Sequence, residues 1–559
     1  MNFVRPALCP AALLAILAIL LASLAIAPAR LPAQEVPPDP LRPLIALPQR
    51  PVILPSMPCK GLVTPVTAYA GSIGYRILSA SEEAAGPDRA AACLVRGYAA
   101  PQTRFELRLP LAGYTGRFLQ GGCGGMCGVI SDSIVPWCSN AHIASGAFAV
   151  AYNDGGHFSA GIGDGTWAVD PELRMQFAHK ATHATALVAK AIVTRFYGRA
   201  PDHSYFVGCS GGGREALMET QRYPTDFDGV VAGSSVSMPA AMQLFLWEAQ
   251  KGLDAKGQEI FTSDSVATLH RAVLAACDRI DGIPDGQIDD PRRCHYDPRL
   301  LLCPDRGQTV APCLDAAQVE AARAYYQGPT DPGGKSLFPG GAPYGSELGW
   351  VGPGAATQTG KFAAESFIKL VLLPGELPEN FGWRDWRFTR ASLERLLEAG
   401  APFDATDPDI SAFRDHGGKL ILWQGLADNA AGARGMLDYY QAVRDRMGGL
   451  AATRAFARMF LVPGGYHCRG GYVPYDQDFL GAMVNWVERG MAPESVIAAA
   501  RLEDGTIRRR PLYAYPVPTR YGGGDVNDPR SFAPGVMKRE PVDGYDWPGS
   551  KAREKSEGP

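Results

Sequence analysis

The fold is decided by the stretch YFVGCSGGGREALMETQRYP, residues 205–224. It begins with aromatic and β-branched residues typical of a buried strand and continues with residues that favour a helix. Ser210 lies between these two parts, with Gly208 before it and Gly212 after it. This arrangement fits the G-x-S-x-G pattern, in which a serine sits on a sharp turn from strand to helix. The pattern predicts a catalytic serine; the alternative is a glycine-rich turn whose serine only caps the helix.

The residues around this turn indicate what the serine could do. Glycines on both sides allow the chain to turn tightly around Ser210. The backbone N–H of Gly211 would lie at a helix N-terminus, where it can point at negative charge that develops on an ester oxygen. We therefore expect Gly211 to contribute to an oxyanion hole.

A serine nucleophile needs a base and an acid, which in folds with this turn follow in the order serine, acid, histidine. Asp428 comes soon after a strand-like run at residues 419–423, and His467 soon after a second run at residues 457–462. Parallel sheets place their chemistry at such strand ends. A single Asp or His in a loop is usually a solvated turn residue, so it is the ordered set of Ser210, Asp428 and His467 that predicts a catalytic triad.

Two cysteines flank the proposed catalytic residues. Cys209 immediately precedes Ser210, and Cys468 immediately follows His467. A disulfide between them would close a long loop and hold the two catalytic loops together. The alternative is a pair of inert buried cysteines.

The rest of the chain indicates an α/β core interrupted by an insertion. Strand-like and helical runs alternate from about residue 118 to residue 231, as expected for a parallel sheet, and resume after residue 402. Residues 238–402 show many Gly, Pro and Asp-Gly turns and no regular alternation. We expect a core formed by residues 56–237 and 403–537, with residues 238–402 as an inserted lid. The clearest single elements are strands at residues 104–109 and 147–152 and helices at residues 177–197 and 479–487.

Composition and the two terminal segments indicate which kind of partner the protein binds and where it is located. The 559 residues carry a net charge of −3, which offers no basic field for nucleic acid and favours a small-molecule partner. Residues 1–33 predict an export signal, with Arg5, an apolar run at residues 11–27 and a cleavage site between residues 27 and 33. The alternative is an uncleaved membrane anchor, but the run is shorter than the ~20 residues of a spanning helix. After cleavage we expect no membrane attachment.

The cysteine content agrees with export. Of twelve cysteines, eleven remain after Cys9 leaves with the signal, which fits secretion or the periplasm. The polar residues 538–559 predict a mobile tail.

The residues resemble the tannase and feruloyl esterase family of serine hydrolases, whose mark is a serine and a histidine that each lie beside a disulfide-bonded cysteine. The similarity covers most of the mature chain and includes Phe196-Tyr197-Gly198, Arg222 to Gly229, Gly417 to Leu420, Trp486-Val487-Glu488 and Arg510 to Leu512. The resemblance implies an α/β-hydrolase core with a large inserted lid. It also implies action on esters of aromatic acids: gallate, ferulate and other hydroxycinnamates, or in one branch mono(2-hydroxyethyl) terephthalate.

The resemblance implies a second oxyanion donor, Gly122, in the glycine-rich loop after a strand at residues 117–120; the alternative is a flexible turn. The chain also departs from the family. Gln424 stands where family members often carry histidine, and Ala430 and Ala431 replace bulkier residues. The resemblance therefore does not assign the substrate.

An acidic loop follows Cys277 and contains Asp278, Asp281 and Asp285. Carboxylates with glycines between them suit Ca²⁺, although the spacing is not that of an EF-hand and an ordinary hairpin turn explains the loop equally well. The resemblance favours structural calcium, held by these side chains and by the carbonyls of Ile283 and Gln287. No organic cofactor is expected. The resemblance further implies the disulfides Cys277–Cys294, Cys303–Cys313 and Cys59–Cys93, and leaves Cys123, Cys127 and Cys138 as three candidates for one bond.

The predicted function is a secreted carboxylic ester hydrolase that acts on esters of aromatic acids through an acyl-enzyme. Enzymatic alternatives are a terephthalate monoester hydrolase and an acyltransferase or peptidase on the same fold. A binding module is the non-enzymatic alternative, but it would be expected to lack one member of the triad. Specificity is expected in the lid, whose aromatic residues are either pocket wall or, as we favour, lid core: Phe338, Tyr344, Trp350, Phe362, Phe367, Trp383 and Trp386.

Overall fold

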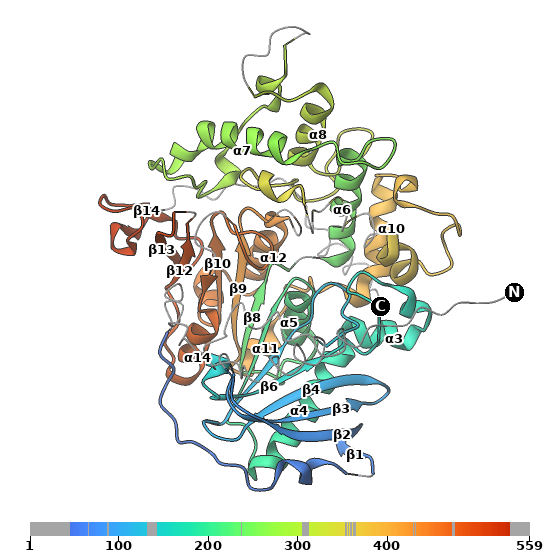
Figure 1. Cartoon of the computed structure of the whole chain (residues 1–559), viewed down its shortest axis with the longest axis vertical. Coiled ribbons are helices and arrows are strands. Elements are labelled where there is room, and N and C mark those ends of the chain that lie inside the picture. Colours follow the sequence, from blue (N-terminus) through green and yellow to red (C-terminus); the bar gives the residue numbers. More distant parts are fainter. Residues whose placement is uncertain are drawn as a thin grey trace, which may run out of the picture. The chain divides into compact units, whose positions relative to one another are not determined.

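A mixed sheet of ten strands forms the centre of the computed structural model (Figure 1). The structure describes residues 45–536 except 65, 87–88, 131–141, 236, 305–311, 353–354, 356, 358–359, 361–364, 429, 431, 472–475 and 503. In order across the sheet the strands are β1 (Ala68–Ala70), β2 (Ile73–Glu83), β3 (Ala92–Ala99), β4 (Thr103–Pro110), β6 (Phe148–Asn153), β5 (Arg117–Gly121), β7 (His203–Cys209), β8 (Gly229–Gly233), β9 (Lys419–Gly425) and β10 (Ala457–Val462). Pairing is antiparallel from β1 to β6 and parallel from β6 to β10.

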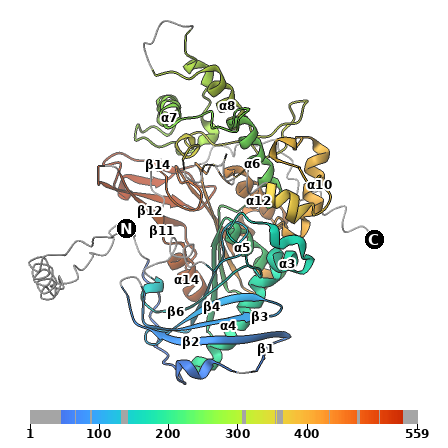
Figure 2. The same ribbon diagram turned by 45° about the vertical axis from the view of Figure 1, so that its right-hand side comes forward.

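Helices cover both faces of the sheet (Figure 2). Those of the core are α3 (Pro171–Met175), α4 (Ala181–Tyr197), α5 (Gly211–Arg222), α11 (Ser411–Asp415), α12 (Ala433–Arg446), α13 (Leu450–Arg454) and α14 (Phe479–Arg489). Phe206 of β7 packs in a cluster with α4 and α12, whereas its neighbours Tyr205 and Val207 pack with α14. Strands covered on both faces are mainly apolar, which is why β7 to β10 are rich in apolar residues.

The insertion enters and leaves between two neighbouring strands. Gly229 of β8 lies opposite Lys419 of β9, although residues 234–418 separate these strands in the chain. The inserted segment contains α6 (Met238–Gly252), α7 (Ser263–Cys277), α8 (Ala316–Gln327) and α10 (Arg390–Gly400). These helices lie together at one end of the sheet in both views (Figures 1 and 2) and have apolar clusters of their own. The insertion therefore adds a lid without disturbing the sheet.

Two small sheets complete the chain. One contains β11 (Asp476–Gln477), β12 (Ser495–Arg501) and β13 (Ile507–Tyr513), and the other β14 (Thr519–Tyr521) and β15 (Phe532–Pro534). The hairpin of β12 and β13 directs Arg508 and Arg510 toward the acidic loop of the lid, because Arg508 donates to the carbonyl of Asp285 (2.9 Å) and Arg510 pairs with its carboxylate.

The predicted elements of the core are present, with two differences. The predicted strands at residues 104–109 and 147–152 are β4 and β6, and the long predicted helix is α4 preceded by a π-helical turn at Gln176–Lys180. The first difference is that β1 to β4 add an antiparallel half to the predicted parallel sheet. The second is that the described part of the lid, where no regular alternation was expected, contains the helices α6, α7, α8 and α10. The predicted signal at residues 1–33 and tail at residues 538–559 lie outside the described residues.

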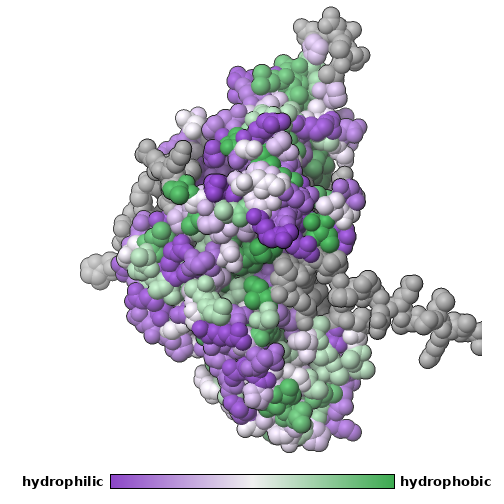
Figure 3. Space-filling model, turned by 90° about the vertical axis from the view of Figure 1, so that its left-hand side faces the viewer, coloured by the Kyte–Doolittle hydropathy of each residue, from purple (hydrophilic) through white to green (hydrophobic). Residues whose placement is uncertain are grey.

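The surface is mixed in polarity. On the face shown in Figure 3, hydrophilic and hydrophobic residues are interspersed. The exposed large apolar residues belong to many different segments, such as Leu54, Phe158, Val169, Leu300 and Met491. Within the part of the chain that the structure describes, none of the helices is both long enough and apolar enough to cross a membrane.

Candidate active site

Ser210 occupies the turn between β7 and α5. Its backbone has φ 60° and ψ −122°, a combination that residues with a side chain rarely adopt and that persists only where the surroundings enforce it. The N–H of Ser210 donates to the carbonyl of Gly233 on β8 (3.0 Å), and its own carbonyl accepts the N–H of Arg214 (3.0 Å). The turn is thus fixed on both sides of the serine.

Close backbone packing explains Gly208 of the motif and Gly213, which directly follows the motif. A Cβ on Gly208 would lie 2.1 Å from the carbonyl oxygen of Gly212, and a Cβ on Gly213 would lie 2.2 Å from that of Gly233. Any side chain at Gly208 or Gly213 would overlap the backbone of a neighbouring segment. The sequence pattern therefore has a steric cause at this turn.

His467 and Asp428 lie on the loops after β10 and β9, as predicted, and they contact each other. The imidazole Nδ1 lies 3.0 Å from Oδ2 and 3.1 Å from Oδ1 of Asp428, whose side chain is fully buried. Burial disfavours the charged imidazole, but the charge of Asp428 and its hydrogen bond outweigh burial, so the pKa of His467 is raised. Contact through Nδ1 leaves Nε2 for another partner.

The predicted disulfide joins the serine turn to the histidine loop. Cys209 and Cys468 are bonded, with their Cα atoms 5.7 Å apart, although 259 positions separate them in the chain. Because Ser210 and His467 are the direct chain neighbours of these cysteines, the bond holds both in one small region. Cys468, like Ser210, has a positive φ (62°).

The structure treats the two predicted oxyanion donors differently. Gly211 is the first residue of α5, so its N–H has no acceptor within the helix and adjoins Ser210. The N–H of Gly122 instead donates to the carbonyl of Val207 (3.0 Å), because pairing between β5 and β7 continues one residue beyond β5. Gly122 is therefore not available as an oxyanion donor in this structure, and that prediction is corrected. The loop comes nearest to Gly211 at Gly125 instead.

A buried acid that was not predicted from the sequence, Glu215, holds this loop in place. Glu215 of α5 accepts the N–H of Cys123 at Oε2 (2.9 Å) and the hydroxyl of Thr182 at Oε1 (3.1 Å). Burial raises the pKa of Glu215. Its position one turn after Ser210 could have suggested a role near the site, but its partners come from distant segments.

With a strained serine, a His–Asp pair and a disulfide in one place, the comparison with known proteins decides the family. A family model described as tannase and feruloyl esterase matches residues 89–534.

The chain belongs to the tannase and feruloyl esterase family.

Relatives and solved structures agree with this assignment. The chain is 34% identical over 504 residues to the mono(2-hydroxyethyl) terephthalate hydrolase of Piscinibacter sakaiensis, covering 77% of this chain and 81% of the relative. It is 33% identical over 395 residues to a probable feruloyl esterase of Arthroderma benhamiae, covering 66% and 70%. Feruloyl esterase B from Aspergillus oryzae superposes with a TM-score of 0.71 at 27% identity, covering 82% of this chain and 97% of that structure.

These similarities establish the fold and the reaction class. The chain has an α/β-hydrolase fold, shared with esterase structures, and it is a carboxylic ester hydrolase of the tannase and feruloyl esterase type. Its substrate is accordingly a small-molecule ester.

The acidic loop of this esterase differs from the prediction in how its carboxylates are used. Asp278 accepts the backbone N–H groups of Asp285 (3.1 Å), Gly286 (3.2 Å) and Gln287 (3.2 Å), and Asp285 pairs with Arg510. Among the described residues, the groups of side chains close enough to share one ion do not include these aspartates. The side chains of Asp278, Asp281 and Asp285 therefore lie on one loop but are not close enough together to share one ion in this structure.

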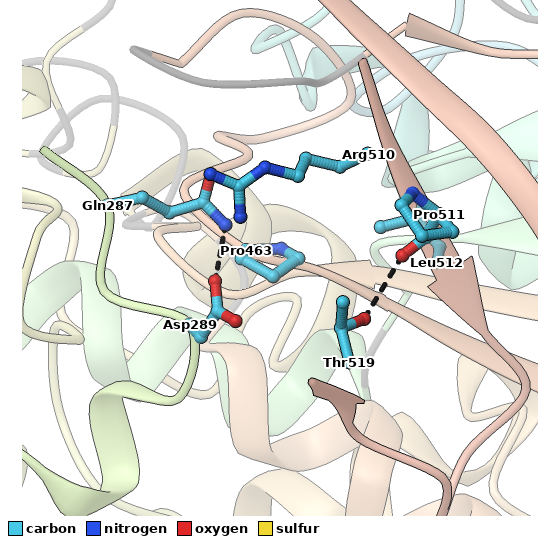
Figure 4. A pocket seen from close by; sticks show the side chains of 7 residues that line it. All are labelled: Gln287, Asp289, Pro463, Arg510, Pro511, Leu512 and Thr519. Atoms are coloured by element: carbon cyan, nitrogen blue, oxygen red, sulfur yellow. Dashed lines mark hydrogen bonds between the residues drawn. The ribbon is translucent and has the colours of Figure 1, made fainter. Parts of the chain in front are cut away.

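Part of the loop nevertheless carries unbalanced negative charge. Oδ2 of Asp281 is buried and has no hydrogen-bond partner within the described chain. Burial and the nearby Asp289 raise the pKa of Asp281 to about 7, and burial raises that of Asp289 to about 6. Figure 4 shows Gln287 and Asp289 facing Arg510 around a small pocket. Asp289 was missed because it lies beyond the predicted ligand run.

The other predicted disulfides are present: Cys59–Cys93, Cys277–Cys294 and Cys303–Cys313. The open choice among three cysteines is settled for two of them, since Cys123 is bonded to Cys127. Cys138 lies outside the described residues.

Most of the predicted lid aromatics are core residues. Phe338, Trp350, Phe367, Trp383 and Trp386 are buried in apolar clusters, and Phe362 lies outside the described residues. Tyr344 is partly exposed and, with Phe338, Leu426 and Arg434, lines a cavity of about 480 Å³ between the lid and α12. The described lining of that cavity does not include Ser210, Asp428 or His467.

Proposed function

We propose that this esterase cleaves esters of aromatic acids with Ser210 as nucleophile, His467 as base and Asp428 as the acid that orients the base. The observation that carries the proposal is the His467–Asp428 contact beside a strained serine to which a disulfide ties it. Nucleophile, base and orienting acid are the three roles that acyl transfer by a serine requires.

Acylation uses each group once. Oγ of Ser210 attacks the ester carbonyl carbon while Nε2 of His467 takes the hydroxyl proton. The N–H of Gly211 stabilises the oxyanion of the tetrahedral intermediate. As the intermediate collapses, the bond to the alcohol oxygen breaks and His467 returns the proton to that oxygen. An acyl group then remains on Ser210.

Deacylation repeats these steps with water. Water attacks the acyl carbon and gives one proton to His467. The bond to Ser210 breaks, the serine oxygen regains the proton from His467, and the carboxylic acid leaves. Asp428 stays ionised throughout, and its contact with Nδ1 fixes the tautomer that keeps Nε2 free to accept.

The aromatic acyl group is proposed from the relatives. Their printed names include feruloyl esterase and mono(2-hydroxyethyl) terephthalate hydrolase, and both substrates contain an aromatic acid. The higher identity to the terephthalate relative, 34% over 504 residues, makes the terephthalate monoester the second candidate substrate.

Hydrolysis of p-nitrophenyl acetate would test the reaction class, and a panel of methyl ferulate, methyl gallate, chlorogenate and mono(2-hydroxyethyl) terephthalate would test the acyl group. We expect at least one aromatic ester to give a kcat/KM well above that of an aliphatic methyl ester. Preference for the aliphatic ester would contradict the proposed substrate class.

We also propose that Ca²⁺ binds the acidic loop as a structural ion, with Asp278, Asp281 and Asp285 and the carbonyls of Ile283 and Gln287 as ligands. The unpartnered Oδ2 of Asp281 and the charge shared with Asp289 support the proposal, since a hard cation prefers carboxylate oxygens and would balance this charge. The loop lies in the lid, away from the triad in sequence, so the ion has no role in the reaction steps.

Export is proposed on separate grounds. Five disulfides occur in the described residues, which is typical of an oxidising compartment. Expression of the full chain in a bacterial host, followed by N-terminal sequencing of the periplasmic or extracellular protein, should place the mature N-terminus between residues 27 and 34. Retention of the full-length chain in the cytoplasm would contradict export.

A further inference from the structure

A buried glutamine contacts the catalytic acid. Gln424 is the second-to-last residue of β9, and its side chain is fully buried. Its side-chain Nε2 donates to Oδ2 of Asp428 (2.9 Å) and to the carbonyl oxygen of Gly425 (3.1 Å). Both of these atoms are acceptors, so only the NH₂ group of the amide can face them. Gln424 is therefore a fixed donor to Asp428.

Other groups also contact the carboxylate of Asp428. Oδ1 accepts the backbone N–H of Ala430 (2.9 Å), and both oxygens contact Nδ1 of His467. Gln424 thus supplies a side-chain donor to Oδ2 in addition to the catalytic histidine. A buried carboxylate is costly without such partners, because hydrogen bonds must replace the water that it has lost.

A second carboxyl group approaches Asp428 from the lid. Glu248 on α6 is buried, and within the described chain neither of its side-chain oxygens has a hydrogen-bond partner. Burial and the charge of Asp428 raise the pKa of Glu248. Proton sharing or repulsion between Glu248 and Asp428 would weaken the hold of Asp428 on His467.

We propose that Gln424 is a positioning residue that keeps Asp428 ionised and aimed at His467 in the presence of Glu248. The inference rests on the proposed function of the triad. An amide does not titrate, so its hydrogen bond persists through the pH range in which His467 changes charge.

The test compares Gln424→Leu, which removes the donor, with Gln424→His, which offers a ring N–H in its place. Gln477→Leu is the matched control, since Gln477 is also a buried strand glutamine and is not a partner in the hydrogen bonds described for the triad. Rates on p-nitrophenyl acetate are normalised to the number of active sites that a fluorophosphonate titrates. Gln424→Leu should lower kcat about 10- to 100-fold with little change in KM, the effect of losing one hydrogen bond to a charged group.

The pH profile distinguishes positioning from a structural role. Once Asp428 shares a proton or turns away, it no longer raises the pKa of His467, so the acid limb of the Gln424→Leu profile should move to lower pH. Gln424→His should recover most of the activity and the original limb. In Gln424→Glu the acid form can donate and the charged form repels, so a new loss of activity should appear as pH rises.

The outcomes separate this inference from the proposed function. If the wild type fails to turn over esters, or Ser210→Ala stays active, the triad itself is wrong. If the wild type is active but titrated Gln424→Leu keeps its kcat and its acid limb, the positioning role is overturned. A lower melting temperature with an unchanged profile would show a structural role only and would also overturn it.

Discussion

The loops after β7, β9 and β10, which carry the triad and are called the catalytic edge below, combine a carboxylate with a neighbouring disulfide, as does the acidic loop of the lid. The two disulfides span very different lengths of chain. Cys209–Cys468 joins residues 259 positions apart, whereas Cys277–Cys294 joins residues 17 apart. At the catalytic edge, Asp428 and His467 come from separate strands and contact each other. In the acidic loop, the carboxylate of Asp278 accepts backbone N–H groups further along the same loop, and one buried oxygen of Asp281 has no hydrogen-bond partner among the described residues. Loops at the ends of neighbouring strands thus pair Asp428 with His467. The short loop closed by Cys277–Cys294 instead leaves the negative charge of Asp281 without a balancing partner among the described residues.

The largest effect on activity is expected when a residue of the triad is replaced. Ser210→Ala and His467→Ala should each lower kcat by ~10⁴-fold or more, and Asp428→Asn should be less severe, because nucleophile and base act as a unit while the acid orients. Steady-state rates on p-nitrophenyl acetate, with circular dichroism as a check on folding, measure this. A folded Ser210→Ala variant with ordinary activity would remove Ser210 from the mechanism.

Removing the long disulfide tests whether it serves the site or only the fold. The chain-entropy model assigns about 5–6 kcal/mol to Cys209–Cys468 and about 3 kcal/mol to Cys303–Cys313. Both double alanine variants should lose stability in denaturant unfolding, but only Cys209→Ala with Cys468→Ala should lose activity while still folded, because small misplacements of catalytic groups cost rate. Equal activity in the two folded variants would contradict a catalytic role for the bond.

The pH dependence sharpens the account of the His–Asp pair. His467 must be neutral to accept a proton, and its pKa is raised above the ordinary value of 6.5, so kcat/KM should fall as pH drops through a midpoint above 6.5. Asp428→Asn removes both causes that raise the pKa and leaves burial, which lowers it. The residual activity of that variant should therefore persist to lower pH. An acid limb that does not move would separate Asp428 from the titrating group.

The smallest expected effect is a change in melting temperature caused by a substitution in the acidic loop. Whether the melting temperature rises or falls tests the calcium proposal. Without a cation, a carboxyl pKa raised to about 7 in the folded protein destabilises it above that pH, so Asp281→Asn should raise the melting temperature at pH 8. With bound calcium, the same change removes a ligand and should lower the melting temperature, by roughly 2–4 °C per kcal/mol lost. Calorimetry in calcium and in chelator compares the two. Equal or higher stability of the variant under both conditions would contradict the calcium site.

The sequence predicted the parts of the fold that depend on local pattern. Buried parallel strands are mainly apolar runs, and the glycines around Ser210 are required by close backbone contact, so both can be recognised without the structure. The antiparallel strands β1, β2 and β3 and the lid helices were missed, whereas the antiparallel strand β4 was predicted. Their burial depends on partners far away in the chain, which periodicity in one segment does not show.

The candidate site likewise contains residues that were predicted from the sequence and residues that were not. Ser210, Asp428, His467 and their cysteines were predicted from position after strands and from chain order. Gly122 was misassigned because the point at which β5 stops pairing with β7 depends on register, which sequence does not give. Glu215, Gln424 and Asp289 act through side-chain contacts with residues placed near them by the fold, and only Gln424 was marked beforehand, as a departure from the family.

The most direct test of the central claim is to locate the acyl group. The esterase would be mixed with p-nitrophenyl acetate, quenched in acid during the burst of p-nitrophenol, digested, and mapped by mass spectrometry. We predict an acetyl group on Ser210 in the peptide that contains Cys209, and none in the Ser210→Ala variant. Stoichiometric acetylation of another residue during turnover, with Ser210 unmodified, would contradict it.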